Sequence, residues 1–279
     1  MWGYLVSFHY SLIKLYLLNS KFHFASSNVQ GLNFVFLIFG VWILTSTACT
    51  KNETEQLDDI QMGYNYFPVQ IGNEWVYQTD SIIYSLQALV QIDSSRSFIR
   101  EVVVDTFRDA VDQLIYRLNV FYAKDTSLGW DLINSSFIES NKLHLIKKEN
   151  GLSFVRLVFP VLTNKAWDGN SMIQAKTNIV IKGELLEAYD DWYYRYKYID
   201  KSEFIGVKSF DKVCKVLEVD NEDIISKRYS EARYARDVGM VYRELWILDT
   251  QNTDLNKSFR DRAEKGFILK QTLVSYFVQ

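Results

Sequence analysis

The sequence predicts a mainly β protein, built as an antiparallel meander that forms a curved sheet, an open barrel or two packed sheets. Beyond residue 64, short runs rich in Val, Ile, Tyr, Phe and Thr alternate with segments of Asn, Asp, Gly and Ser, which is the composition of strands and turns. The pair Asn150-Gly151 lies between two apolar runs and predicts a tight hairpin. Helical stretches long enough for βαβ crossovers are missing from the sequence pattern, so antiparallel pairing is favoured.

Individual elements follow from the same pattern. We expect strands, in chain order, over residues 98–107, 114–122, 143–148, 152–159, 192–199, 204–207, 213–219, 241–248 and 267–278. Residues 184–189 (ELLEAY) are the best short helix candidate, and residues 223–235 are compatible with a helix or a strand. The triplet Asp237-Val238-Gly239 offers a turn between two strands, because glycine accepts a positive φ.

The N-terminal segment differs sharply from the rest of the chain. Lys14 and Lys21 are the only charged side chains among residues 1–48. Residues 34–44 form an unbroken apolar run, which is followed by the small polar stretch 45–48 (TSTA) and then by Cys49. A run of this length suits a signal peptide better than a membrane span, which needs about 20 residues. The sequence therefore predicts a signal or leader segment (1–48), a lipidated Cys49 that begins a flexible tether (49–63), and a β-rich domain (64–279).

Two features of this segment leave alternatives open. The residue three positions before Cys49 is Ser46, where a lipoprotein signal usually has Leu, so an uncleaved membrane anchor with an incidental cysteine is the competing interpretation. The leader is also longer than the usual 15 to 30 residues. A start codon placed too far upstream explains the extra length, and so do two membrane helices.

A short pattern occurs twice and suggests an internal duplication. Both prolines of the chain, Pro68 and Pro160, stand in the triplet FPV, and each triplet is followed by five residues and a tryptophan, Trp75 or Trp167. Two related halves, 64–158 and 159–279, would account for this. The competing interpretation is that proline is tolerated at strand edges and that aromatic neighbours are common in β proteins.

Charge and composition exclude several classes of function. The chain of 279 residues has 31 Lys and Arg against 34 Asp and Glu, so no basic excess is available to bind a phosphate backbone, and we expect no nucleic-acid partner. The nucleotide-binding, metalloprotease, EF-hand and serine-hydrolase motifs are missing. After Cys49 the only histidine and cysteine are His144 and Cys214, each within a strand-like run. We therefore predict no catalytic residue, no metal site and no cofactor.

Carboxylates are more plentiful and leave one catalytic alternative. Asp190-Asp191 and residues 220–223 (DNED) are the densest acidic clusters. The second cluster lies between two apolar runs and is best explained as a turn, with calcium binding as the lesser alternative.

The segment from Trp192 to Tyr198 carries four alternating aromatic side chains. In a strand, Trp192, Tyr194, Tyr196 and Tyr198 share one face. Such a row is a candidate ligand-binding surface, because aromatic rings with polar tips stack on sugars. The alternative is that the row belongs to the hydrophobic core. Exposure of the four side chains distinguishes the two.

Two motifs resemble a known group of proteins. Residues 66–77 (YFPVxxGNxWxY) and 234–244 (YARDVGMVYRE) are similar to recurring motifs of an uncharacterised family of Bacteroidetes outer-membrane and surface lipoproteins, and the resemblance covers residues 49–279. It implies a lipidation cysteine, an acidic tether and one β-rich domain, and it implies no activity. Lys51 followed by acidic residues is also similar to the signal that sends such lipoproteins to the cell surface.

Together these observations predict an outer-membrane lipoprotein that faces the periplasm or the cell exterior. We expect a non-enzymatic protein that binds a ligand or partner, with the membrane contacted through the lipid anchor and a glycan or an envelope protein as partner. The alternative is a carbohydrate-active hydrolase, which requires two facing carboxylates about 5 to 9 Å apart.

Overall fold

The computed structural model describes residues 58–174 and 176–279, so the predicted leader, Cys49 and most of the tether lie outside the described residues. Strands dominate the described part of the chain and helices are few and short, which confirms the predicted mainly β class. Among these residues no helix has the length and hydropathy needed to cross a membrane.

The elements are as follows. The helical segments are α2 (Asp59–Met62), η1 (Tyr64–Tyr66), η2 (Thr126–Leu128) and α3 (Phe259–Arg262). The first group of strands is β1 (Glu74–Tyr84), β2 (Ile92–Arg108), β3 (Leu114–Ala123), β4 (Asp131–Ser140), β5 (His144–Glu149), β6 (Leu152–Val158) and β7 (Ala166–Trp167). The second group is β8 (Asn178–Ile181), β9 (Glu184–Glu187), β10 (Tyr194–Ile205), β11 (Lys208–Glu222), β12 (Ser226–Ala235), β13 (Gly239–Asp249) and β14 (Lys265–Phe277).

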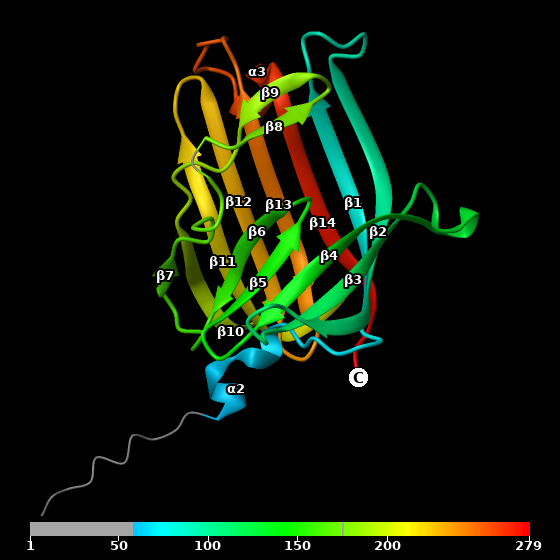
Figure 1. Cartoon of the computed structure of the whole chain (residues 1–279). Coiled ribbons are helices and arrows are strands. Elements are labelled where there is room, and N and C mark those ends of the chain that lie inside the picture. The colour runs from blue at the N-terminus through cyan, green and yellow to red at the C-terminus, as the bar shows by residue number, and fades with distance from the viewer. Residues whose placement is uncertain (1–57, 175) are drawn as a thin grey trace, which may run out of the picture. The chain divides into compact units, whose positions relative to one another are not determined.

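Twelve of these strands form one antiparallel sheet in the order β6-β5-β4-β3-β2-β1-β14-β13-β12-β11-β10-β7. The chain thus makes one meander from β1 to β6 and a second from β10 to β14, and β14 pairs with β1 to join the two. Figure 1 shows that the sheet is strongly curled, so that its two ends face each other. The backbone N–H of Val155 on β6 donates to the carbonyl of Gly169, just after β7, at 2.8 Å. The sheet is therefore nearly closed and barrel-like, with a continuous interior.

Tight turns connect neighbouring strands where the sequence predicts them. Asn150 and Gly151, between β5 and β6, have φ values of 50° and 82°, the left-handed conformation that a two-residue hairpin requires. Between β12 and β13, Asp237 and Gly239 also have positive φ values, of 62° and 107°. The Asn-Gly signal is therefore confirmed, and so is the turn at 237–239.

The predicted helix at residues 184–189 is wrong. Glu184–Glu187 is strand β9, which pairs with β8 as a separate two-stranded sheet. The turn between them, Lys182-Gly183, has positive φ at both residues and favours a hairpin over a helix. Leu186 is buried and the residues on either side of it are exposed, so burial alternates as it does in a strand. Packing therefore outweighs the high helical propensity of this segment.

Other segments differ from expectation in length rather than type. The undecided segment at 223–235 contains strand β12, and residues 204–207 are the end of β10 and the following turn rather than a separate strand. Strand β4 was not predicted, because its N-terminal half is exposed and carries no apolar alternation.

Large aromatic side chains belong to the hydrophobic core inside the sheet. Trp75, Tyr66, Tyr77, Tyr194 and Tyr196 are all fully buried. The indole N–H of Trp75 donates to the carbonyl of Val238, which fixes the first strand of one meander against the 237–239 turn of the other.

The two tryptophans of the repeated pattern have different surroundings. Trp75 lies on an 11-residue strand paired on both sides, whereas Trp167 lies on the two-residue strand β7 and is half-buried. The indole N–H of Trp167 donates to the carbonyl of Val155 at 2.8 Å. Both indoles are thus hydrogen-bonded to main chain, but from positions that do not correspond in the sheet. Internal duplication stays a prediction.

Candidate functional site

A cavity of about 560 Å³ lies inside the curled sheet. Its volume falls in the range of small-molecule sites. The apolar part of its wall comes from several strands, among them β2, β3, β13 and β14, and includes Ile99, Val120, Leu245 and Leu269. The polar part includes Glu101, Lys147, Glu149, Arg243, Thr79 and Ser136. The site thus combines an apolar wall with a cluster of charged and hydroxyl groups.

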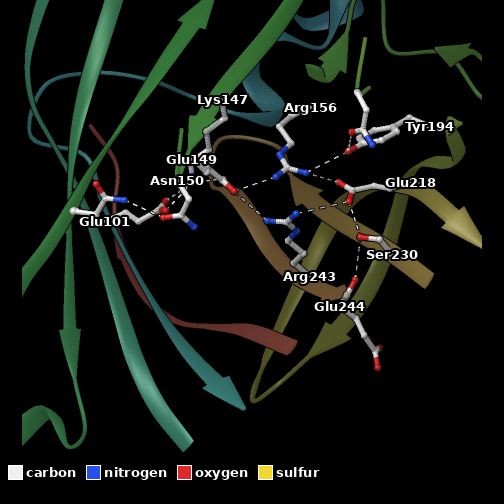
Figure 2. Close-up of polar contacts among 12 residues, drawn as sticks. Glu101, Lys147, Glu149, Asn150, Arg156, Tyr194, Glu218, Ser230, Arg243 and Glu244 are labelled. Atoms are coloured by element: carbon white, nitrogen blue, oxygen red, sulfur yellow. Dashed lines mark hydrogen bonds and ion pairs between the residues drawn. The ribbon is translucent and has the colours of Figure 1, made fainter. Parts of the chain in front are cut away.

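Six buried or nearly buried charged side chains form a continuous network at this cavity (Figure 2). Three are cations and three are carboxylates: Lys147, Arg156, Arg243, Glu101, Glu149 and Glu218. The contacts are Lys147 Nζ to Glu101 (2.7 and 2.9 Å) and to Glu149 (3.1 Å), Arg156 to Glu149 (3.0 Å) and to Glu218 (3.0 Å), and Arg243 to Glu149 (3.3 Å) and to Glu218 (3.9 Å). Every cation therefore contacts two carboxylates, and the network carries no net charge.

Strand alternation and a β-bulge direct these side chains toward the interior of the sheet. Lys147 and Glu149 alternate with outward-facing residues on β5, as do Glu101 on β2 and Arg243 on β13. The register between β5 and β6 shifts so that Arg156 has no paired residue of its own, which allows both Arg156 and the next residue, Leu157, to be buried.

Glu218 lies at a second register shift, between β11 and β12, and is fully buried. Its carboxylate accepts a hydrogen bond of 2.6 Å from the Ser230 hydroxyl on the neighbouring strand. The Arg156 guanidinium, which pairs with Glu218, also stacks over the Phe154 ring at 4.2 Å from the ring centre. Hydrogen bonds and stacking thus hold the buried end of the network in a fixed geometry.

Burial and neighbouring charges act in opposite directions on the pKa of Glu149. Burial alone would raise this pKa, but the charges of Lys147, Arg156 and Arg243 outweigh it and hold the pKa well below its ordinary value. The pKa of Lys147 is raised, because the attraction of Glu101 and Glu149 exceeds the effect of burial. Glu149 is therefore ionised and Lys147 is protonated at neutral pH.

Several polar atoms at the cavity have no hydrogen-bond partner among the described residues. These atoms are the hydroxyl oxygens of Thr79 and Ser136 and the Nε–H of Arg243, all three buried. Each belongs to a residue that lines the cavity. A buried polar group without a partner is costly, so these three atoms are unsatisfied polar groups in residues of the cavity wall.

The β8–β9 hairpin crosses one end of the curled sheet (Figure 1). Ile179 and Ile181 on this hairpin line the cavity, so the hairpin forms a strap over it. One end of the strap is held by Arg228 on β12, whose Nε and Nη2 donate to the carbonyl of Glu187 at 3.0 and 2.7 Å. Its other end contacts the loop after β1 through the hydroxyl of Ser85, which donates to the Glu184 carboxylate.

The predicted aromatic row does not lie at the surface. Trp192, Tyr194 and Tyr196 are buried, with exposures of 2%, 0% and 0%, as the core alternative expects. Tyr194 touches the network, because its hydroxyl contacts Arg156 at 3.5 Å. A register shift after Tyr196 places Tyr198 opposite Lys215 rather than Cys214, so the four residues do not share one face as simple alternation predicts. Ligand binding by this row stays a prediction.

The other residues singled out by the sequence lie apart from the network. Residues 220–222 of the acidic cluster are the end of strand β11 rather than a turn, because they pair with β12. Only Asp223 lies in the connection to β12, where its carboxylate accepts hydrogen bonds from the backbone N–H groups of Ile225 and Ser226. Asp190 and Asp191 line a separate cavity of about 450 Å³. Within 58–174 and 176–279, no group of three or more His, Cys, Asp or Glu side chains is placed to hold a metal ion.

His144 and Cys214 have ordinary surroundings. His144 is half-buried and contacts Asn141 at 3.0 Å. Cys214 is fully buried, and this burial raises the pKa of its thiol far above the ordinary value, which disfavours a thiolate nucleophile.

The charged network was not predicted from the sequence, although a signal for it exists. Glu101 stands between Ile99 and Val103 at the two-residue spacing of one strand face, and Arg243 stands likewise between Val241 and Leu245. A charge at an inward position of an alternating strand is unusual. Several such positions in different strands indicate a buried ionic cluster, but not which residues pair.

Comparisons with known proteins give few matches. No protein-family model matches the chain, and no curated protein matches it in sequence. Two solved structures resemble it weakly. One, from Bacteroides fragilis, is described as an exported protein with a YmcC-like fold (10% identity, 76% of this chain and 98% of that chain, TM-score 0.32). The other, from Parabacteroides distasonis, is described as a lipoprotein (14% identity, 76% and 98%, TM-score 0.31). TM-scores of this size identify neither a shared family nor a shared site.

Proposed function

We propose that this protein is a non-enzymatic envelope lipoprotein that binds a small molecule inside its curled sheet. The observation that carries the proposal is the 560 Å³ cavity, at which Thr79, Ser136 and Arg243 have buried polar atoms without a partner among the described residues. An apolar cavity with a few convergent polar groups is the usual form of a small-molecule site.

Hydrolysis by paired carboxylates, the alternative from the sequence, has less support. A glycosidase needs one carboxyl group whose raised pKa lets it act as a general acid. Glu101 and Glu149 both line the cavity, but both contact the Lys147 ammonium, and the pKa of Glu149 is shifted in the opposite direction. Binding therefore explains the site better than catalysis does.

The lipid anchor is the second part of the proposal, and its support comes from the sequence. The apolar run before Cys49 and the acidic tether after it resemble a lipoprotein signal, and they support a lipid-anchored protein at the outer membrane. In a host that processes lipoproteins, Cys49→Ala is expected to abolish incorporation of labelled fatty acid and to release the protein from the membrane fraction. Retention of label by this variant would contradict the anchor.

A fluorescent probe tests the binding site. N-phenyl-1-naphthylamine, an uncharged apolar dye, is expected to bind the purified full chain saturably with increased fluorescence. Val120→Trp places an indole into the cavity from β3 and is expected to weaken dye binding at least tenfold. Leu132→Trp is the matched control, because Leu132 is exposed on the neighbouring strand β4 and does not line the cavity.

Two outcomes oppose the proposal. A fluorescence titration that does not reach a plateau would refute a ligand site in the cavity. Equal dye affinities of the Val120→Trp and Leu132→Trp proteins would refute it as well. Thermal unfolding of both variants shows whether they are folded. If Val120→Trp does not fold, Val120→Phe gives the same test with a smaller side chain.

A further inference from the structure

We infer that the cavity takes an uncharged single-chain amphiphile, with its polar head at Thr79, Ser136 and Arg243 and its apolar chain beneath the β8–β9 strap. This inference rests on the proposed binding function and names the chemical class of its ligand. It follows from the charge balance of the network, the three polar atoms without partners, and the apolar wall and volume of the cavity.

The charge balance disfavours an ionised ligand. The network holds three cations and three carboxylates, each cation contacting two carboxylates, so it has no spare charge. Two carboxylates, Glu101 and Glu149, line the cavity and would repel an anion, and two cations, Lys147 and Arg243, would repel an ammonium group. Moving an ion from water into such a site is costly, because its charge remains uncompensated.

The polar atoms without partners define the head group. The Arg243 Nε–H can only donate, whereas the hydroxyls of Thr79 and Ser136 can donate or accept. A ligand oxygen that accepts hydrogen bonds therefore satisfies the arginine, and a ligand hydroxyl can satisfy the other two. An ester, an amide or a glycerol-like head provides such groups without a charge.

The wall and the volume define the rest of the ligand. Aliphatic side chains such as Val120 form much of the cavity wall, and Ile179 and Ile181 of the strap also line it. At about 30 Å³ for each water-sized group, the 560 Å³ volume holds roughly 20 non-hydrogen atoms. One medium-length acyl chain with a small head fits this volume, and a two-chain phospholipid does not.

Competition with the dye tests the class of ligand. The probes are 1-monolauroylglycerol, laurate and dodecyltrimethylammonium, which carry similar chains on a neutral, an anionic and a cationic head, and maltose as a neutral sugar. All are used with the full chain below their critical micelle concentrations. We expect 1-monolauroylglycerol to displace N-phenyl-1-naphthylamine at concentrations at least tenfold lower than either ion does, and maltose to displace none.

Substitutions at the head-group position give a second test. Thr79→Val and Ser136→Ala each remove one hydroxyl and are expected to weaken 1-monolauroylglycerol binding by roughly three- to tenfold, the effect of one neutral hydrogen bond. Neither is expected to lower the melting temperature, because neither hydroxyl has a hydrogen-bond partner within residues 58–174 and 176–279. Thr272→Val is the control, because Thr272 is paired with Gln78 and does not line the cavity.

The outcomes separate this inference from the proposed function. Equal displacement by laurate, preferential displacement by maltose, or unchanged 1-monolauroylglycerol affinity in both hydroxyl variants would overturn the amphiphile while leaving the cavity as a binding site. A lower melting temperature with unchanged affinity would assign the hydroxyls a structural role and would also overturn it. A dye that does not bind at all refutes the proposed function itself.

Discussion

Replacing Arg156 with methionine removes one cation from a network of three cations and three carboxylates. Arg156 is 3% exposed and pairs with Glu149 and Glu218, each at 3.0 Å. In the variant, the fully buried Glu218 keeps two partners among the described residues, the Ser230 hydroxyl and the more distant Arg243, at 3.9 Å. Breaking a buried ion pair by removing one partner costs about 3–5 kcal/mol, because the remaining charge is not compensated. We expect the free energy of unfolding to fall by about 4 kcal/mol, within that range.

A second substitution tests whether charge balance causes this loss. Glu218→Gln in the Arg156→Met background restores a neutral network. We expect the double variant to lose about 1–3 kcal/mol less unfolding free energy than the sum of the losses in the two single variants. Urea denaturation of the full chain, followed by tryptophan fluorescence, measures each value. Arg96→Met is the matched control, because Arg96 forms an ion pair with Asp80 at the surface and its removal is expected to have a far smaller effect. Similar losses in Arg156→Met and Arg96→Met would refute the reasoning.

Three further predictions concern acid stability, the buried thiol and one glycine. The lowered pKa of Glu149 contributes stability above its ordinary pKa of 4.5, and this stability is lost as the pH falls below that value. The urea concentration at the unfolding midpoint should therefore fall less steeply from about pH 6 to 3 in Glu149→Gln than in the native protein. An unchanged slope would contradict this. Cys214→Ala should lower the free energy of unfolding by about 1 kcal/mol. The native Cys214 thiol should resist alkylation by iodoacetamide at pH 8, and rapid labelling of the folded protein would show that the thiol is not buried. Gly266→Ala should destabilise the protein by roughly 1–3 kcal/mol in thermal or urea unfolding, because Gly266 has a φ of 114° and a Cβ there would overlap the Ile247 carbonyl; Gly183→Ala, with positive φ but open space around it, should cost less.

Local signals in the sequence determined the class of fold. Alternation of apolar and polar residues identifies strands such as β3 and β13 because a strand buries one face and exposes the other. Asn150-Gly151 identifies a hairpin because the left-handed backbone that such a turn needs is accessible to those residues. These interactions act over a few residues, so they can be recognised without knowing what the segment packs against.

Packing between distant segments decided the points that the sequence could not. Residues 184–187, which are part of the strap, form a strand because Leu186 packs into the hydrophobic core, and the register shift after Tyr196 gave Tyr198 a different partner from the one that alternation predicts. Neither a register shift nor the partner of a short hairpin leaves a local signal.

The candidate site depends on the tertiary structure even more strongly. Glu101, Lys147 and Arg243 each appear in the sequence as a charge in an alternating strand, a pattern that alone gives no partner. Glu101 and Lys147 are 46 residues apart, and Glu149 and Arg243 are 94 apart, yet each pair is in contact. The sequence by itself determined that the chain forms strands and turns. Only the curling of the sheet, which brings β2, β5, β6, β11 and β13 around one interior, decided which charges neutralise one another and where a cavity remains.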